Sequence, residues 1–195
     1  MGGNMELILA SQSPRRHEIM AYMRLPYQTE ACTEPENIPA GLSVAETVMH
    51  LAAQKASFAL RLHPDDCVIG ADTIVELDGE IIGKPKSTED AVRTLMRMQG
   101  RKHTVYTGLA VLKSGYSDVR YVTTRVLFRR MSEKEIRWYV STGEPMDKAG
   151  SYGAQGIGSI FVDSIEGNYF NVVGLPAPVL YEMLLNAGAV TEDRT

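Results

Sequence analysis

The pattern of apolar and polar positions predicts strands and helices that mix along the whole chain. Short apolar or alternating runs predict strands at 6–10, 27–32, 68–77, 80–82, 103–113, 119–130, 159–164 and 170–173. Capping signals and apolar stripes predict helices at 14–23, 43–62, 88–99, 132–142 and 177–186. This order favours an α/β fold with a mixed sheet and flanking helices, arranged as two lobes around a cleft.

Residues 68–73 (VIGADT) combine a buried strand pattern with an acidic residue. The apolar run leads into Asp72, and a hairpin with an Asp-Gly turn follows. Because ligands bind at the carboxyl ends of strands in open α/β sheets, Asp72 at a strand end is the first candidate for chemistry. An aspartate that only caps a turn is the alternative interpretation.

A second candidate site follows the first predicted strand, where the sequence reads SQSPRR. Ser13 is suited to cap a helix and Pro14 to occupy its first position. The helix N-terminus offers backbone N–H groups, and Ser11, Arg15 and Arg16 lie beside it. The segment therefore predicts a phosphate site, and a capped helix with solvent-exposed arginines is the alternative.

Two glycine-containing segments carry further basic residues. Lys84 stands between a glycine and a proline, which limits its backbone freedom. Residues 144–158 (EPMDKAGSYGAQGIG) place Lys148 and Gln155 in a loop whose glycines would let the backbone approach a ligand closely. A flexible surface loop is the alternative. Lysines and arginines neutralise phosphate oxygens and carboxylates hold Mg²⁺, so these regions suit a phosphate chain with a divalent cation.

Composition narrows the classes of function. A net charge of −4 over 195 residues argues against nucleic-acid binding. The sequence has no run of about 18 apolar residues to span a membrane, and it has no secretory signal pattern. Cys32 and Cys67 lack metal or redox spacing and are expected to be reduced thiols of a cytoplasmic protein. Residues 1–5 (MGGNM) are left out of the fold prediction as a disordered or non-native start.

Four motifs together resemble the Maf family of nucleoside triphosphate pyrophosphatases. They are SQSPRR, GADTIV, GKP and EPMDKAGSYGAQG, in that order, and the resemblance runs from residue 7 to about residue 185. It implies a Maf/inosine-triphosphatase-like fold and hydrolysis of a nucleoside triphosphate to the monophosphate and pyrophosphate. It also implies a divalent metal, Mg or Mn, a cytoplasmic location and often a homodimer.

The resemblance also implies roles for individual residues. Asp72 corresponds to the proton acceptor of the family, and Glu36, or else Glu34, corresponds to a functional loop glutamate. Asp72 and Glu36 are then the expected metal ligands. The residues expected to bind substrate are Ser11, Ser13, Arg15, Arg16, Lys55, Lys84 and Lys148.

Three positions suggest a subgroup. Arg15, Thr73 and Gln155 resemble the branch that acts on dTTP and UTP. The Gln155 amide can pair with the carbonyl and N–H edge of a pyrimidine. A pyrophosphatase of the sister branch, acting on 7-methyl-GTP, is one alternative. A nucleotide-binding regulator of septum formation is another.

Overall fold

The computed structural model describes residues 5–192 and forms a mixed α/β fold. Residues 1–4 of the predicted disordered start lie outside the described residues. The strands are β1 (Leu7–Leu9), β2 (Gln28–Thr29), β3 (Cys67–Leu77), β4 (Glu80–Ile82), β5 (Lys102–Lys113), β6 (Tyr116–Phe128) and β7 (Val162–Glu166). The helices are α1 (Pro14–Met23), α2 (Val44–Leu62), α3 (Thr88–Met98), α4 (Glu133–Ser141), α5 (Tyr169–Val173) and α6 (Ala177–Asn186). Three 3₁₀ turns, η1 (Glu144–Asp147), η2 (Ala149–Ser151) and η3 (Ile157–Phe161), lie between α4 and β7.

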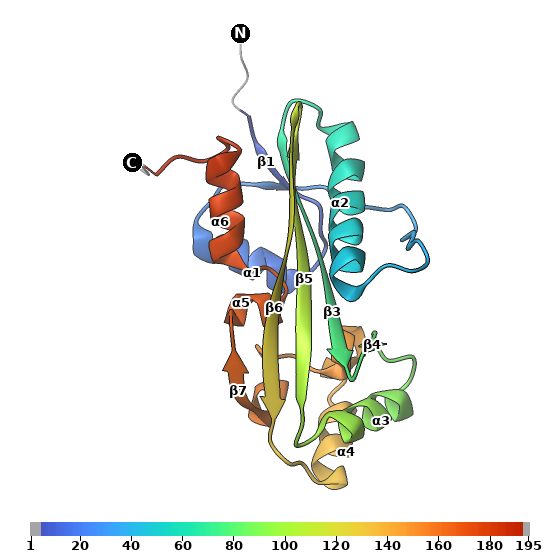
Figure 1. Ribbon diagram of the computed structural model, residues 1–195. Coiled ribbons are helices and arrows are strands. Elements are labelled where there is room, and N and C mark those ends of the chain that lie inside the picture. The colour runs from blue at the N-terminus through green and yellow to red at the C-terminus, as the bar shows by residue number, and fades with distance from the viewer. Residues whose placement is uncertain (1–4, 193–195) are drawn as a thin grey trace. The chain divides into compact units, whose positions relative to one another are not determined.

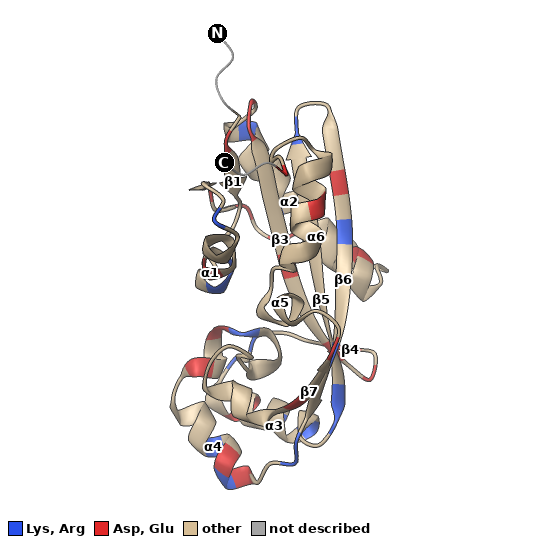
Figure 2. Cartoon of the chain, turned by 90° about the vertical axis from the view of Figure 1, so that its left-hand side faces the viewer, with Lys and Arg blue, Asp and Glu red and all other residues tan. Residues whose placement is uncertain are grey.

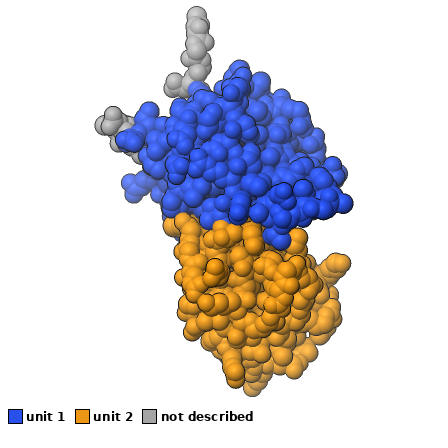
Figure 3. Space-filling model, in the orientation of Figure 1, with its two compact units in different colours: residues 1–72, 107–122, 174–195 blue, residues 73–106, 123–173 orange. Residues whose placement is uncertain are grey.

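The strands form one seven-stranded sheet in the order β2-β1-β3-β5-β6-β7, and β4 pairs with β3 outside this order (Figure 1). β1 is parallel to β2 and β3, whereas the β3–β4 and β6–β7 pairs are antiparallel. The sheet is therefore mixed, as the sequence predicts. The chain divides into two compact units, 1–72 with 107–122 and 174–195, and 73–106 with 123–173 (Figure 3). We call them unit 1 and unit 2.

Unit 1 holds α2 against one side of its strands, and α1 and α6 lie together on the other side (Figure 1). The α2 contact is unusually close because both surfaces are made of small residues. A Cβ added to Gly70 of β3 would lie 2.2 Å from the backbone oxygen of Ala52. A Cβ added to Gly108 of β5 would lie 2.1 Å from that of Val48. Glycine is thus required at both positions for lack of space, and this fixes the height of α2 above the sheet.

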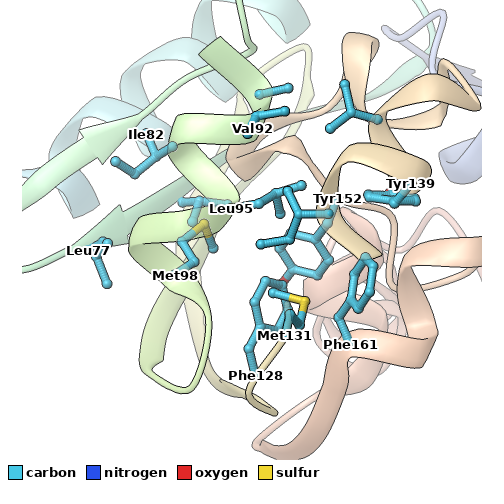
Figure 4. Close-up of a cluster of buried hydrophobic side chains, with 14 of the residues drawn as sticks. Leu77, Ile82, Val92, Leu95, Met98, Phe128, Met131, Tyr139, Tyr152 and Phe161 are labelled. Atoms are coloured by element: carbon cyan, nitrogen blue, oxygen red, sulfur yellow. The ribbon is translucent and has the colours of Figure 1, made fainter. Parts of the chain in front are cut away.

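Unit 2 is organised around a larger apolar cluster between its strands, α3 and α4 (Figure 4). Aromatic rings of Phe128, Tyr152 and His103 meet edge to face, with Phe128 and Tyr152 centroids 4.7 Å apart. His103 Nε2 lies 2.9 Å from the Tyr152 hydroxyl. Burial lowers the pKa of His103 to about 4, so the imidazole is neutral within this core at neutral pH.

Several local predictions are confirmed. Capping boxes start α2 at Ser43 and α4 at Ser132. The Asp78-Gly79 turn joins β3 to β4, and both residues have positive φ, as a type I′ turn requires. Helix α6 has the predicted bounds, 177–186. Cys32 and Cys67 are free thiols.

Three strand predictions were wrong in type or length. Residues 169–173 form helix α5, because the Asn168 side chain accepts the backbone N–H of Asn171 at 3.0 Å and starts a helical turn. The segment 157–161 is the turn η3, so β7 begins only at Val162. The segment 27–32 pairs with β1 only at Gln28 and Thr29 before the chain leaves the sheet.

We predict that Gly108→Ala destabilises the protein by at least about 2 kcal/mol, because backbone atoms of α2 must move to admit the methyl group. Urea unfolding measures the change. Gly83→Ala is the matched control, since a Cβ at Gly83 meets nothing within 4 Å, and it should change stability by less than about 0.5 kcal/mol. Equal stability of the two variants would contradict the close packing of α2 on the sheet.

Candidate active site

Asp72 lies in the middle of a strand, which corrects its prediction as a strand-end residue. It is part of the 11-residue strand β3, because residues 73–77 continue the strand and pair with β4. The neighbouring strand β1, however, ends at Leu9, opposite Ile69. Ala10 donates a last backbone hydrogen bond to Ile69, at 2.8 Å. Asp72 therefore lies just past the carboxyl end of its parallel neighbour, which is where the chain turns toward α1.

Lys55 on α2 brings two carboxylates together. Its Nζ lies 2.5 Å from Asp72 Oδ1 and 2.9 Å from Glu36 Oε1. The Lys55 and Asp72 side chains are 19% and 13% exposed, whereas Glu36 is 53% exposed. A partly desolvated ion pair is stronger than a surface pair. The expected catalytic residues Asp72 and Glu36 thus share one ammonium group in unit 1.

The two loop glutamates that the sequence could not distinguish have different partners. Glu36 pairs with Lys55, whereas Glu34 Oε1 pairs with Arg61 Nη2 at 2.5 Å. Both Glu34 and Arg61 are exposed, so that pair is a surface ion pair. The segment that carries Glu36 is tied to α2 by Gln54, which donates to Pro35 O at 2.8 Å and accepts from Asn37 N at 3.2 Å. The geometry brings Glu36, and not Glu34, to the ammonium group that also binds Asp72.

Arg16 extends this cluster from the first turn of α1 (Figure 2 marks the basic residues of α1). Its Nη1 donates to Ser11 Oγ at 3.1 Å and its Nε donates to Gly174 O at 2.8 Å. Burial lowers the pKa of Arg16, and the charges of Asp72 and Glu36 oppose that shift. The guanidinium remains charged and interacts electrostatically with both carboxylates. Sequence reasoning did not single out Gly174, because a carbonyl contact leaves no signature in residue type.

Ser13 and Arg15 complete the predicted phosphate segment in unit 1. Ser13 is the N-cap of α1, but its side chain makes no capping hydrogen bond. Its backbone N–H instead donates to Ser11 Oγ at 3.2 Å. Pro14 at the first position of α1 has no N–H, so the first backbone N–H groups of the helix are those of Arg15 and Arg16.

The other predicted residues, Thr73, Lys84, Lys148 and Gln155, belong to unit 2. Lys84 is exposed, and its segment is joined to η2 by a hydrogen bond from Gly150 N to Gly83 O at 3.2 Å. The Lys148 ammonium turns back toward its own loop. It donates to Glu144 O at 2.5 Å and to Asp147 Oδ1 at 2.7 Å.

Sequence reasoning missed Glu144 and Tyr139, which contact the glycine loop directly. Tyr139 OH donates to Glu144 Oε1 at 2.9 Å, and Glu144 accepts from Ile157 N at 2.8 Å. The only sequence signal was the acidic residue at the start of EPMDK, and acidic residues in loops are usually solvated.

The carboxylates of unit 1 suit a metal ion only together with a ligand. Within residues 5–192 no group of three or more His, Cys, Asp or Glu side chains could hold one. Two carboxylates, those of Asp72 and Glu36, do form ion pairs with the same ammonium group, that of Lys55. Mg²⁺ commonly binds through one or two carboxylates, substrate phosphates and water, so these residues fit a cation that arrives with a phosphate ligand.

Comparison with known proteins decides the family. The family model described as "Maf-like protein" matches residues 6–187. The chain belongs to the Maf family. This confirms the resemblance carried by the four motifs.

Curated relatives cover nearly the whole chain. The "dTTP/UTP pyrophosphatase" of Bacillus pumilus (strain SAFR-032) is 48% identical over 88% of this chain and 90% of its own length. The protein of that name from Desulfotalea psychrophila (strain LSv54 / DSM 12343) is 48% identical over 92% of this chain and 93% of its own. Among solved structures, the Staphylococcus aureus Ham1 protein covers 94% of this Maf-family chain and 99% of its own, with a TM-score of 0.52 and 16% identity. That similarity shows a shared fold.

Proposed function

We propose that this chain is a nucleoside triphosphate pyrophosphatase that hydrolyses dTTP and UTP to the monophosphate and pyrophosphate. One observation carries the proposal. The Asp72–Lys55–Glu36 cluster interacts electrostatically with the buried Arg16, in a chain 48% identical to a "dTTP/UTP pyrophosphatase" over 88% of its length. The cluster supplies a base, a cation and a second carboxylate, which are the groups that hydrolysis of a phosphoanhydride needs.

Asp72 is the group that we assign to accept the proton of the attacking water. Lys55 engages Oδ1, so Oδ2 is the oxygen assigned to that proton. The water oxygen forms a bond to the α-phosphorus, and the bond from the α-phosphorus to the α,β-bridging oxygen breaks. Pyrophosphate leaves with the electron pair of that bond. Arg16 and Lys55 stabilise negative charge on the phosphates.

Asp72 and Glu36 are the residues that would hold a divalent cation, Mg or Mn, and the cation would supply additional positive charge to the triphosphate. Glu36 is well placed for this because its side chain is half exposed. Lys55 in turn keeps the two carboxylates together when the triphosphate is absent, because it offsets their mutual repulsion.

Further substrate-binding roles are proposed from the family resemblance alone. Lys84 and Lys148 would contact phosphates, as the family resemblance implies. Arg15, Thr73 and Gln155 would select the base, with the Gln155 amide pairing with the carbonyl and N–H edge of uracil or thymine. This supports dTTP and UTP over 7-methyl-GTP, whose cationic base an acidic side chain would suit better.

The cytoplasmic location and the homodimer stay predictions that rest on the family resemblance. Among the described residues, none of the helices has the length and apolar character needed to cross a membrane.

Turnover of a nucleotide panel tests the proposal. Purified protein with Mg²⁺ or Mn²⁺ is given dTTP, UTP, CTP, GTP and 7-methyl-GTP, and monophosphate and pyrophosphate are measured. We expect pyrophosphate from dTTP and UTP at rates well above those for the other three. Turnover of 7-methyl-GTP alone would overturn the base selection but keep the chemistry. Tight nucleotide binding without turnover would favour the regulator of septum formation.

A matched pair of loop variants tests the assignment of Glu36. Glu36→Gln removes the second carboxylate from Lys55 and should lower kcat/KM for dTTP by about 10²-fold, in the range of other lost electrostatic contacts. Glu34→Gln removes only the exposed pair with Arg61 and should change kcat/KM less than about twofold, as expected for a surface ion pair. If the two variants lose equal activity, Glu36 has no special role.

A further inference from the structure

A single carboxylate, that of Glu144, organises the glycine loop of unit 2. Its Oε2 accepts from Ile157 N at 2.8 Å, and its Oε1 accepts from Gly158 N at 3.0 Å. Its Oε1 also accepts from Tyr139 OH at 2.9 Å. Hydrogen bonds to an ionised acceptor are about twice as strong as neutral ones. The carboxylate therefore fixes the backbone on the C-terminal side of Gln155.

Tyr139 fixes the backbone on the other side of Gln155. Its hydroxyl accepts from Gly153 N at 3.1 Å while it donates to Glu144. The Tyr139 ring is fully buried and packs edge-on against Phe161, with centroids 5.0 Å apart. Residues 153–158 are thus tied at both ends to one Tyr139–Glu144 pair, and Gln155 lies between the two attachment points.

The glycines of this loop are explained by the same pair. A Cβ at Gly156 would lie 2.6 Å from Glu144 Oε2, and one at Gly158 would lie 2.7 Å from Tyr139 OH. A Cβ at Gly153 would lie 2.9 Å from Lys148 Cε and 3.1 Å from Glu144 Oε1. These three glycines therefore give space to Glu144, Tyr139 and Lys148. The sequence interpretation, close approach to a ligand, is not needed to explain them.

The charge of Glu144 is maintained by its surroundings. Partial burial alone would raise the pKa of Glu144. Hydrogen bonds from Gly158, Ile157 and Tyr139 and the charge of Lys148 together lower it by more, so the net pKa lies below the usual range. The main-chain oxygen of Glu144 also accepts from Lys148 Nζ at 2.5 Å. One residue thus holds both the loop that carries Gln155 and the ammonium of Lys148.

We propose that Glu144 is a positioning residue for base selection, which acts by fixing the loop that carries Gln155. The proposal rests on the proposed function, in which Gln155 reads the pyrimidine edge. An amide side chain selects a base only if its oxygen and nitrogen are held in place, because a mobile amide can turn to suit either pattern of donors and acceptors. Glu144 fixes the backbone from which this amide projects.

Glu144→Gln tests the proposal with little change in volume. The new amide cannot accept from both Ile157 and Gly158, because its nitrogen is a donor that faces a backbone N–H. We expect the ratio of kcat/KM for dTTP to that for CTP to fall by about tenfold, the cost of losing one such interaction. Glu133→Gln is the matched control, since Glu133 is an exposed residue of α4 that pairs with Arg137 on the helix surface, and it should leave the ratio unchanged.

Amide hydrogen exchange without nucleotide provides an independent measurement. In Glu144→Gln the amides of Ile157 and Gly158 should exchange at least about tenfold faster than in the wild type, because their acceptor is lost. Faster exchange with an unchanged dTTP-to-CTP ratio would overturn the positioning role. Unchanged exchange would overturn the attachment of the loop to Glu144.

Two further results separate this proposal from the proposed function. A wild type that hydrolyses neither dTTP nor UTP would refute the function and the selection role, while exchange would still report whether Glu144 fixes the loop.

If Glu144→Gln does not fold, Tyr139→Phe takes its place, because it keeps the buried ring and removes only the hydroxyl. It should speed exchange at Gly153 and lower the dTTP-to-CTP ratio, and a variant unchanged in both would contradict the proposal.

Discussion

The position of the Lys55 ammonium group between Asp72 and Glu36 is the interaction on which the rest of the site depends. Two carboxylates would repel each other in a partly buried place, and the ammonium at 2.5 and 2.9 Å offsets that repulsion. Its placement depends on how closely α2 lies on the sheet, which the space at Gly70 and Gly108 permits. Two glycines without side chains thus determine where these charges meet.

The two units contribute different kinds of order. In unit 1 the charges are held by ion pairs and by Arg16, which is anchored to Ser11 and Gly174. In unit 2 a loop is held by neutral backbone donors that converge on Glu144. Ion pairs suit the binding of phosphates, whose charge they match. A rigid hydrogen-bonded loop suits the reading of a base, whose donors and acceptors must meet fixed partners.

Local sequence signals predicted much of the fold because their causes are local. The capping boxes and the Asp-Gly turn could be read directly. Specific side-chain contacts, one of them local and the others distant in sequence, decided what the sequence missed. The segment 170–173 looked like a strand from its aromatic and β-branched residues, but Asn168 starts a helical turn there. Glu36 is distinguished from Glu34 by its partner: Glu36 pairs with Lys55, 19 residues away in the chain, and Glu34 pairs with Arg61, 27 residues away. The role proposed for Glu144 depends on backbone N–H groups, which residue types do not reveal.

A double-mutant cycle on Lys55 and Asp72 tests the central claim most directly. Lys55→Met, Asp72→Asn and the double variant are compared with the wild type by kcat/KM for dTTP. If the two residues act as one unit, the double variant should be about as active as the weaker single variant, as is found for catalytic residues that work together. Losses that multiply in the double variant would show that Lys55 and Asp72 act independently, and would contradict the dependence of the site on their ion pair.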